Sequence, residues 1–271
     1  MYSAILSLLA AGGVWCGLFF GGLCEWPGAT GWAVPSWFVF FIATQRAAKK
    51  GVDKVQAAMQ ACMSEGQSRL QSKIQRMQMR INSISAAKQA QAEIERDQAE
   101  IVKSALSIVD GLERFKGWIP LMGRQIASMR MQFHWTLKDY AKVDELMPKA
   151  MLLDPMLRAV AMARMYMRGD DMEKIAKIYL AGAARLRYNQ GTILPAAFSW
   201  MQLKKGDADG AFKTLTEALK KSDDATLKRN HECLMNNRVG HFSNSGLGDQ
   251  WYSLLLEEPK VHVQRQRSVY R

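Results

Sequence analysis

Charged residues are almost absent from the first 45 positions of the chain. Glu25 is the only Asp, Glu, Lys or Arg before Arg46, and residues 1–24 contain none. As a helix, such a segment extends about 36 Å, which exceeds a hydrocarbon core of roughly 30 Å. The lack of charge therefore predicts that this segment crosses a membrane.

A second apolar stretch, residues 29–44, follows a turn-like segment at 25–28 and is rich in tryptophan and phenylalanine. Pro35 lacks a backbone donor and shortens the regular helix expected here, so two interpretations stay open. The stretch either completes a transmembrane helical hairpin, which is the first choice, or forms a re-entrant or interfacial segment. In both cases residues 1–45 are a membrane anchor in contact with lipid.

The orientation of this anchor follows from the basic residues that come after it. Arg46, Lys49 and Lys50 follow the apolar region closely, and no Lys or Arg precedes it. Short segments rich in Lys and Arg stay on the cytoplasmic side of a membrane. We therefore expect an integral membrane protein whose residues after 45 are cytoplasmic.

Motifs for catalysis and for metal or cofactor binding are also lacking. The sequence has no Walker loop, no HExxH, no GxSxG and no GxGxxG after a strand. Its four histidines are scattered and its four cysteines show no CxxC spacing. We predict no catalytic residue, no metal site, no cofactor and a function other than that of an enzyme. The cysteines are Cys16, Cys24, Cys62 and Cys233.

Glycine and proline become rare after Val52, and helix-forming residues dominate residues 46–116. Apolar residues recur there at spacings of four and three, which predicts a coiled-coil stalk with one narrow apolar stripe. The spacing slips after Ile84, so the stalk is either a long continuous helix or an antiparallel hairpin. Such a stripe needs a covering helix, from a second copy in an oligomer, from another protein, or from the chain itself. The first part of the stripe is Leu70, Ile74, Met77, Ile81 and Ile84.

A weak internal repeat follows the break at residues 117–123 and extends to residue 259. Turns begin near residues 138, 169 and 206. The first interval between them is slightly shorter, and the second slightly longer, than the roughly 34 residues of one helix-turn-helix unit. The residues at these turns and at the small or aromatic positions resemble the tetratricopeptide repeat family. They are Tyr140, Ala150, Pro155, Gly169, Asp170, Gly206, Asp207, Ala211 and Ala218.

This resemblance implies stacked helix pairs whose first helices line a surface that binds peptides or helices. Five polar residues fall on those first helices and form the candidate partner-binding set. Several of them are basic, so an acidic peptide or a carboxylate is the expected ligand. The set is Arg130, His134, Arg164, Arg168 and Gln202.

The net charge is +12, with 37 basic against 25 acidic residues, but the excess is concentrated in short segments. Residues 260–271 form a basic tail, and a wide basic face is not indicated, so no nucleic acid is expected. The sequence predicts an all-α protein with a transmembrane helical hairpin, a helical stalk and an α-solenoid similar to tetratricopeptide repeats. The functional hypothesis is a membrane-anchored scaffold that recruits a protein partner, and the alternative is a structural subunit of a larger heteromeric membrane assembly.

Overall fold

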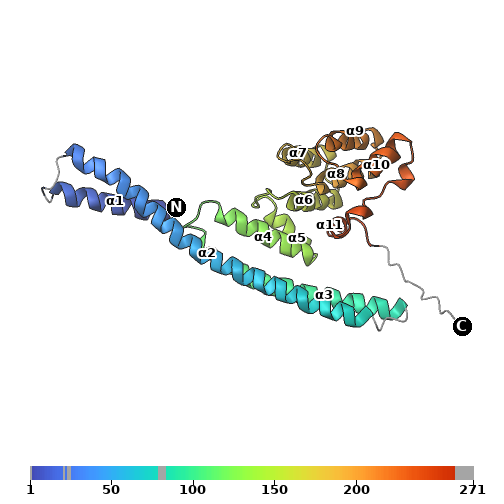
Figure 1. The fold of residues 1–271 in the computed structure, drawn as a ribbon, viewed down its shortest axis with the longest axis horizontal. Helices are drawn as coiled ribbons and strands as arrows, with labels where there is room; N and C mark the ends of the chain where they lie inside the picture. Colours follow the sequence, from blue (N-terminus) through green and yellow to red (C-terminus); the bar gives the residue numbers. More distant parts are fainter. Residues whose placement is uncertain (1, 21, 23–25, 79–83, 260–271) are drawn as a thin grey trace. The chain divides into compact units, whose positions relative to one another are not determined.

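The computed structural model describes residues 2–20, 22, 26–78 and 84–259 (Figure 1). These residues form helices and turns, with no strand in any of the four ranges, so the all-α prediction is confirmed. They divide into two compact units, one ending at Phe133 and one beginning at His134. The domain boundaries expected from the sequence stay predictions. The basic tail, Cys24, Glu25 and Ile81 lie outside the described residues.

The first unit begins with helix α1 (Tyr2–Phe20), which packs along the N-terminal part of α2 (Trp26–Gln78). Helix α2 begins at Trp26, so residues 26–28 are helical and not the expected turn. It also continues through Pro35, because a proline removes only one of the many hydrogen bonds of a long helix. Within the described ranges, no helix combines the length and apolar composition needed to cross a membrane.

Helix α3 (Ile84–Asp110) runs back along α2, so the stalk is an antiparallel hairpin and not one continuous helix (Figure 1). The two helices approach closely at Gly66, where an added Cβ would lie 2.7 Å from the Ile101 side chain. Lys73 Nζ bridges them through Asp97 at 2.5 Å and Glu93 at 2.6 Å. The chain therefore covers much of its own apolar stripe.

A third helix, α4 (Met122–Thr136), closes the core at the base of the hairpin. Val52, Val109, Leu112, Met122 and Ile126 are buried together there, and Phe115, in the 3₁₀ helix η1 (Glu113–Phe115), packs against them. Three helices remove this part of the stripe from water, which stabilises the unit by roughly 1.5–3 kcal/mol for each large apolar side chain.

The second unit is a stack of helix pairs. Neighbours in sequence pack on each other from α6 to α10, and α6 also contacts α8 directly. This pattern places each pair against the next, as expected for a helical repeat. The helices are α5 (Tyr140–Leu146), α6 (Pro155–Arg168), α7 (Met172–Ala183), α8 (Ile193–Lys204), α9 (Ala208–Leu219), α10 (Ala225–Met235) and α11 (Asp249–Tyr252), with the 3₁₀ helices η2 (Val239–His241) and η3 (Ser245–Leu247) before α11.

Capping residues and glycines set the ends of these helices. Gly169 and Gly206 have φ values of 82° and 87°, as the predicted turns require. Asp207 caps α9 by accepting a hydrogen bond from the Gly210 backbone N–H. At the preceding turn Asp171 caps α7, and Asp170 lies between α6 and α7 as its predicted place in the turn requires.

The other predicted repeat positions have structural roles inside the stack. Ala150 and Ala211 are buried, and Ala218 packs against the core formed by Ala196, Leu215 and Leu227. Pro155 opens helix α6, where a missing N–H costs no hydrogen bond. Tyr140 packs edge-on against Trp135, with ring centroids 5.6 Å apart.

The stack ends in two helices of unequal length with a loop between them. Helix α10 is present, but α11 has only four residues. A buried polar network holds the loop between them, because Asn230 donates to Asn244, and Asn244 donates to the Ala196 carbonyl at 2.9 Å. Satisfying these buried groups fixes the loop between α10 and α11.

Replacing Gly169 or Gly206 with valine should destabilise the second unit. A β-branched residue at a φ near +85° costs about 1–2 kcal/mol. We expect each variant to lower the melting temperature of the full-length chain, measured by circular dichroism at 222 nm. Gly240→Val is the matched control, since a side chain there meets nothing within 4 Å and its φ is outside the left-handed region. Equal melting of all three variants would contradict the left-handed turns.

Candidate functional site

The predicted partner-binding residues make contacts within their own units. Arg130 lies in the first unit, where its guanidinium donates to Asp110 and Glu113 at 2.6 Å each. The other four lie in the second unit. His134 is half-buried, with Nδ1 3.2 Å from Asp139 Oδ2. The charge of Arg130 is therefore paired within the first unit, whereas His134 lies near a carboxylate and its Nδ1 makes no hydrogen bond among the described residues.

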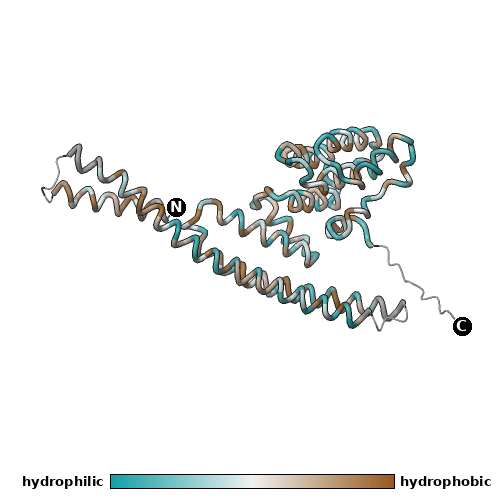
Figure 2. The backbone as a smooth tube through the Cα atoms, in the orientation of Figure 1, coloured by the Kyte–Doolittle hydropathy of each residue, from teal (hydrophilic) through white to brown (hydrophobic). Residues whose placement is uncertain are grey.

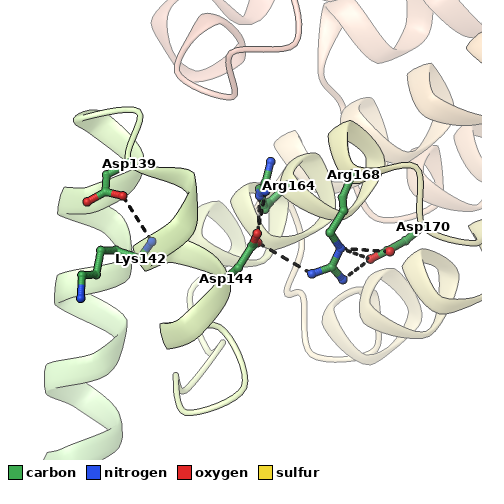
Figure 3. Close-up of polar contacts among 6 residues, drawn as sticks. All are labelled: Asp139, Lys142, Asp144, Arg164, Arg168 and Asp170. Carbon is green, nitrogen blue, oxygen red and sulfur yellow. Dashed lines mark hydrogen bonds and ion pairs between the residues drawn. The ribbon is translucent and has the colours of Figure 1, made fainter.

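Arg164 and Arg168 belong to a network of charges between α5 and α6 (Figure 3). Arg164 makes a two-pronged contact with Asp144, through Nε at 2.8 Å and Nη2 at 2.6 Å. Its guanidinium also lies over the Tyr140 ring, 4.9 Å from the centroid. Arg168 donates to Asp170 and lies 3.8 Å from Asp144. The network ties α5 to the stack.

The Asp144 carboxylate is the centre of this network. Its hydrogen bonds with Arg164 lower its pKa below the usual value, and the charge of Arg168 acts in the same direction. Its side chain is 28% exposed and that of Arg164 is 17% exposed, so solvent screens this pair less than a surface pair. The two arginines are thus already neutralised, which leaves little charge for an acidic ligand.

Gln202 faces the neighbouring helix rather than solvent. Its Oε1 accepts a hydrogen bond of 2.8 Å from the Thr214 hydroxyl on α9. An added Cβ at Gly210 would lie 2.7 Å from its amide nitrogen, so Gln202 occupies the space that this glycine leaves. It supports the packing of α8 on α9.

An aromatic cluster that the sequence did not indicate connects three first helices with the C-terminal segment. Tyr166 on α6 packs edge-on against Trp200 on α8, with centroids 5.5 Å apart. Trp200 in turn packs edge-on against Trp251, at 5.6 Å. On α4, the Trp135 indole donates to the Ser253 carbonyl at 2.8 Å. Residues 249–257 therefore cover part of the face where a partner was expected.

One carboxylate holds this segment in place. Glu257 accepts hydrogen bonds from the indoles of Trp200 and Trp251, each at 2.8 Å. Trp251 and Leu254 are completely buried beneath it. No sequence spacing indicates this contact, because Trp200 and Glu257 are 57 residues apart. The chain itself thus supplies the acceptor oxygens for both indole N–H groups.

A buried arginine was also not predicted from the sequence. Arg158 on α6 is 7% exposed, and its Nη1 donates to the Ile178 carbonyl at 3.2 Å. Burial lowers its pKa, and the nearby charge of Arg185 lowers it further. Its aliphatic stem fills the space beside Gly182, which explains why that position of the repeat has no side chain.

In the part of the chain that the structure describes, no group of three or more His, Cys, Asp or Glu side chains is arranged to hold a metal ion. Comparison with protein-family models, with curated proteins and with solved structures gives no match.

Replacing Asp144 with asparagine should destabilise the second unit at neutral pH. The charge-assisted hydrogen bonds to Arg164 are lost, at a cost of about 2 kcal/mol. The pKa of Asp144 is lowered by folding, so its contribution is present above the unfolded value and lost as the pH falls through the lower, folded value. The difference in the free energy of unfolding between wild type and variant, measured with urea, should be complete at pH 7. It should shrink as the pH falls below about 4.

Glu145→Gln is the control for this experiment. Glu145 is the next residue and also pairs with lysines, but it does so on the open surface. Exposed pairs contribute little, so its stability should stay near that of the wild type. An equal loss in both variants would show that the Asp144 network has no special role.

Replacing Glu257 with glutamine should loosen the C-terminal segment. Glutamine offers one acceptor oxygen, so one indole N–H loses its partner at a cost of about 1 kcal/mol. We expect a red-shifted tryptophan emission and faster hydrogen exchange in residues 249–257. Glu258→Gln changes an exposed neighbour in the same way and should leave both signals unchanged. An unchanged spectrum for Glu257→Gln would contradict the bridging role.

Proposed function

We propose that the protein is a membrane-anchored adaptor, in which α1 and the N-terminal part of α2 insert into a bilayer as a helical hairpin. The helix pairs of the second unit, which we propose to be similar to tetratricopeptide repeats, bind a protein partner on the cytoplasmic side. The proposal assigns no catalytic role to the chain.

A surface of large apolar side chains on α1 and α2 carries the proposal. Their exposed fractions reach 69% at Leu9, 79% at Phe20 and 66% at Val39, and the hydropathy colouring of Figure 2 is brown along much of α1. Each such side chain costs roughly 1.5–3 kcal/mol to keep in water. Contiguous patches of this kind mark surfaces covered by lipid or protein. Further members are Ile5, Leu6, Leu8, Trp32, Val34, Phe38, Phe40 and Ile42.

Aromatic and basic residues gather where this apolar surface ends. The Tyr2 backbone N–H donates to the Gly117 carbonyl at 2.9 Å, and its ring lies 6.2 Å from that of Trp118. The Gln45 amide donates to the Trp118 carbonyl at 3.1 Å, and Arg46 follows at once. Tyrosine and tryptophan favour the level of the lipid headgroups, with Lys and Arg on the cytoplasmic side. This arrangement supports a membrane boundary near Tyr2 and Gln45.

A specific observation favours the second candidate function, a structural subunit of a heteromeric membrane assembly. The face expected to bind a partner is partly covered by residues 249–257, through Trp251 and Glu257. A repeat domain whose face is occupied by its own chain contributes to an assembly mainly through its outer surface. Mass measurement of complexes released from native membranes separates the two functions, since only the second requires a large particle of dissimilar chains.

The double substitution Leu8→Arg with Leu9→Arg should release the protein from membranes. Each arginine costs about 2.5–3.5 kcal/mol at the centre of a membrane helix, so insertion becomes unfavourable. The expected result is a fall in the fraction that stays in the membrane pellet after washing with alkaline carbonate.

The matched control is Leu153→Arg with Leu180→Arg, which changes two leucines of similar exposure in the second unit. These leucines are 57% and 62% exposed, and the control protein should stay in the pellet. Wild-type protein that appears in the soluble fraction without detergent would contradict the proposed membrane anchor.

A further inference from the structure

A long open groove runs between α2 and α3, away from α4. It has a volume of about 1290 Å³, and every residue that lines it belongs to one of these two helices. Small and apolar side chains form its floor, including Ala61, Ala90 and Ile101. The groove extends over residues 58–77 of α2, which is roughly 30 Å of helix. This length matches the contact made by a helix of about five turns.

The burial of the apolar stripe changes along the hairpin. Where α4 supplies a third helix, Val109 and Leu112 are 0% and 1% exposed. Along the groove the same stripe continues through Leu70, Ile94 and Ile101, which stay only partly buried. Two helices cover a single seam, whereas bundles of three or four helices bury the full stripe. The groove is therefore the section that still needs covering helices.

The two walls of the groove have opposite charge. Arg69, Lys73 and Arg76 recur along α2 at spacings of four and three, which places them on one side of that helix. Glu93, Asp97 and Glu100 recur along α3 in the same way. Glu65 also lines the α2 wall and pairs with Arg69 one turn away, and Lys73 is bound to Glu93 and Asp97 across the seam. For Arg76 and Glu100, no ion pair occurs within the described ranges.

A second copy of the same chain brings counter-charges to both walls of the groove at once. A two-fold axis along the hairpin keeps every residue at its own height and sets α2 of one copy beside α3 of the other. Gly66 lies level with Ile101, and Lys73 lies level with Glu93 and Asp97. Arg69 of one copy then faces Glu100 of the second, and Arg76 faces Glu93. A partner with a single sign of charge would leave one wall without a counter-charge.

We propose that this groove is the interface of a homodimer, in which α2 and α3 of two copies form an antiparallel four-helix bundle. Each of the two charge contacts occurs twice by symmetry, and the half-buried side chains of the groove floor lose their remaining exposure. Because the axis runs along the hairpin, the apolar surfaces of α1 in both copies lie at the same end of the dimer. The dimer does not depend on the proposed membrane anchor, although it is compatible with it.

A charge-exchange experiment tests the interface on the full-length chain in mild detergent. One variant carries Arg69→Glu and Arg76→Glu, and the other carries Glu93→Lys and Glu100→Lys. Each variant alone places like charges opposite each other at both contacts, so we expect dimerisation to weaken at least tenfold. Mixed in equal amounts, the two variants restore opposite charges at every contact, and the mass of a two-chain particle should return. The polypeptide mass is measured by light scattering after size exclusion.

The mixture also distinguishes charge repulsion from misfolding, because a variant with a damaged hairpin would not form a dimer on mixing. Lys103→Glu is the control, since this exposed residue of α3 does not line the groove and should leave the dimer intact. A monomeric wild-type chain would overturn the proposal. So would single variants that dimerise as well as wild type, or a mixture that stays monomeric. A wild-type chain that forms the dimer but appears in the soluble fraction without detergent would count against the membrane anchor alone.

Discussion

Burial of a narrow apolar stripe is the constraint on which the first unit depends. Helices α2 and α3, of 53 and 27 residues, each carry one such stripe, and leaving it in water is unfavourable for either helix. Folding back brings the stripes together, and Gly66 allows Ile101 to approach the α2 backbone. A third helix completes the burial at the base. The same physical requirement therefore explains both the closed core near α4 and the open groove beyond it.

In the second unit, the positions of polar groups depend on whether their hydrogen bonds are satisfied. The charges of Arg164 and Arg168 are matched by Asp144 and Asp170, so a count of basic residues overstates the charge open to a ligand. The indole N–H groups of two tryptophans near the core both donate to the Glu257 carboxylate. Buried donors without acceptors are costly, and this cost holds the C-terminal segment against the stack.

Features that depend on local chemistry were predictable. A composition rich in helix formers indicated an all-α chain, and the slip after Ile84 indicated a break that allowed a hairpin as one of two outcomes. Gly169 and Gly206 have the backbone conformation that their turns require. The candidate site was harder to predict, because the position of a basic residue on a predicted first helix does not show which side chain it will pair with. Asp144 lies 20 residues from Arg164, and no motif connects them.

Propensity, capping and positive φ act over a few neighbouring residues, so many helices and their ends could be inferred from the order of residues alone. The packed structure was needed to show that the stalk folds back on itself, that Gln202 supports α9, and that residues 249–257 cover the face formed by Trp135 and Trp200. These outcomes depend on contacts between residues far apart in the chain. Their energies come from burial and from the pairing of polar groups, which exist only once the helices have packed.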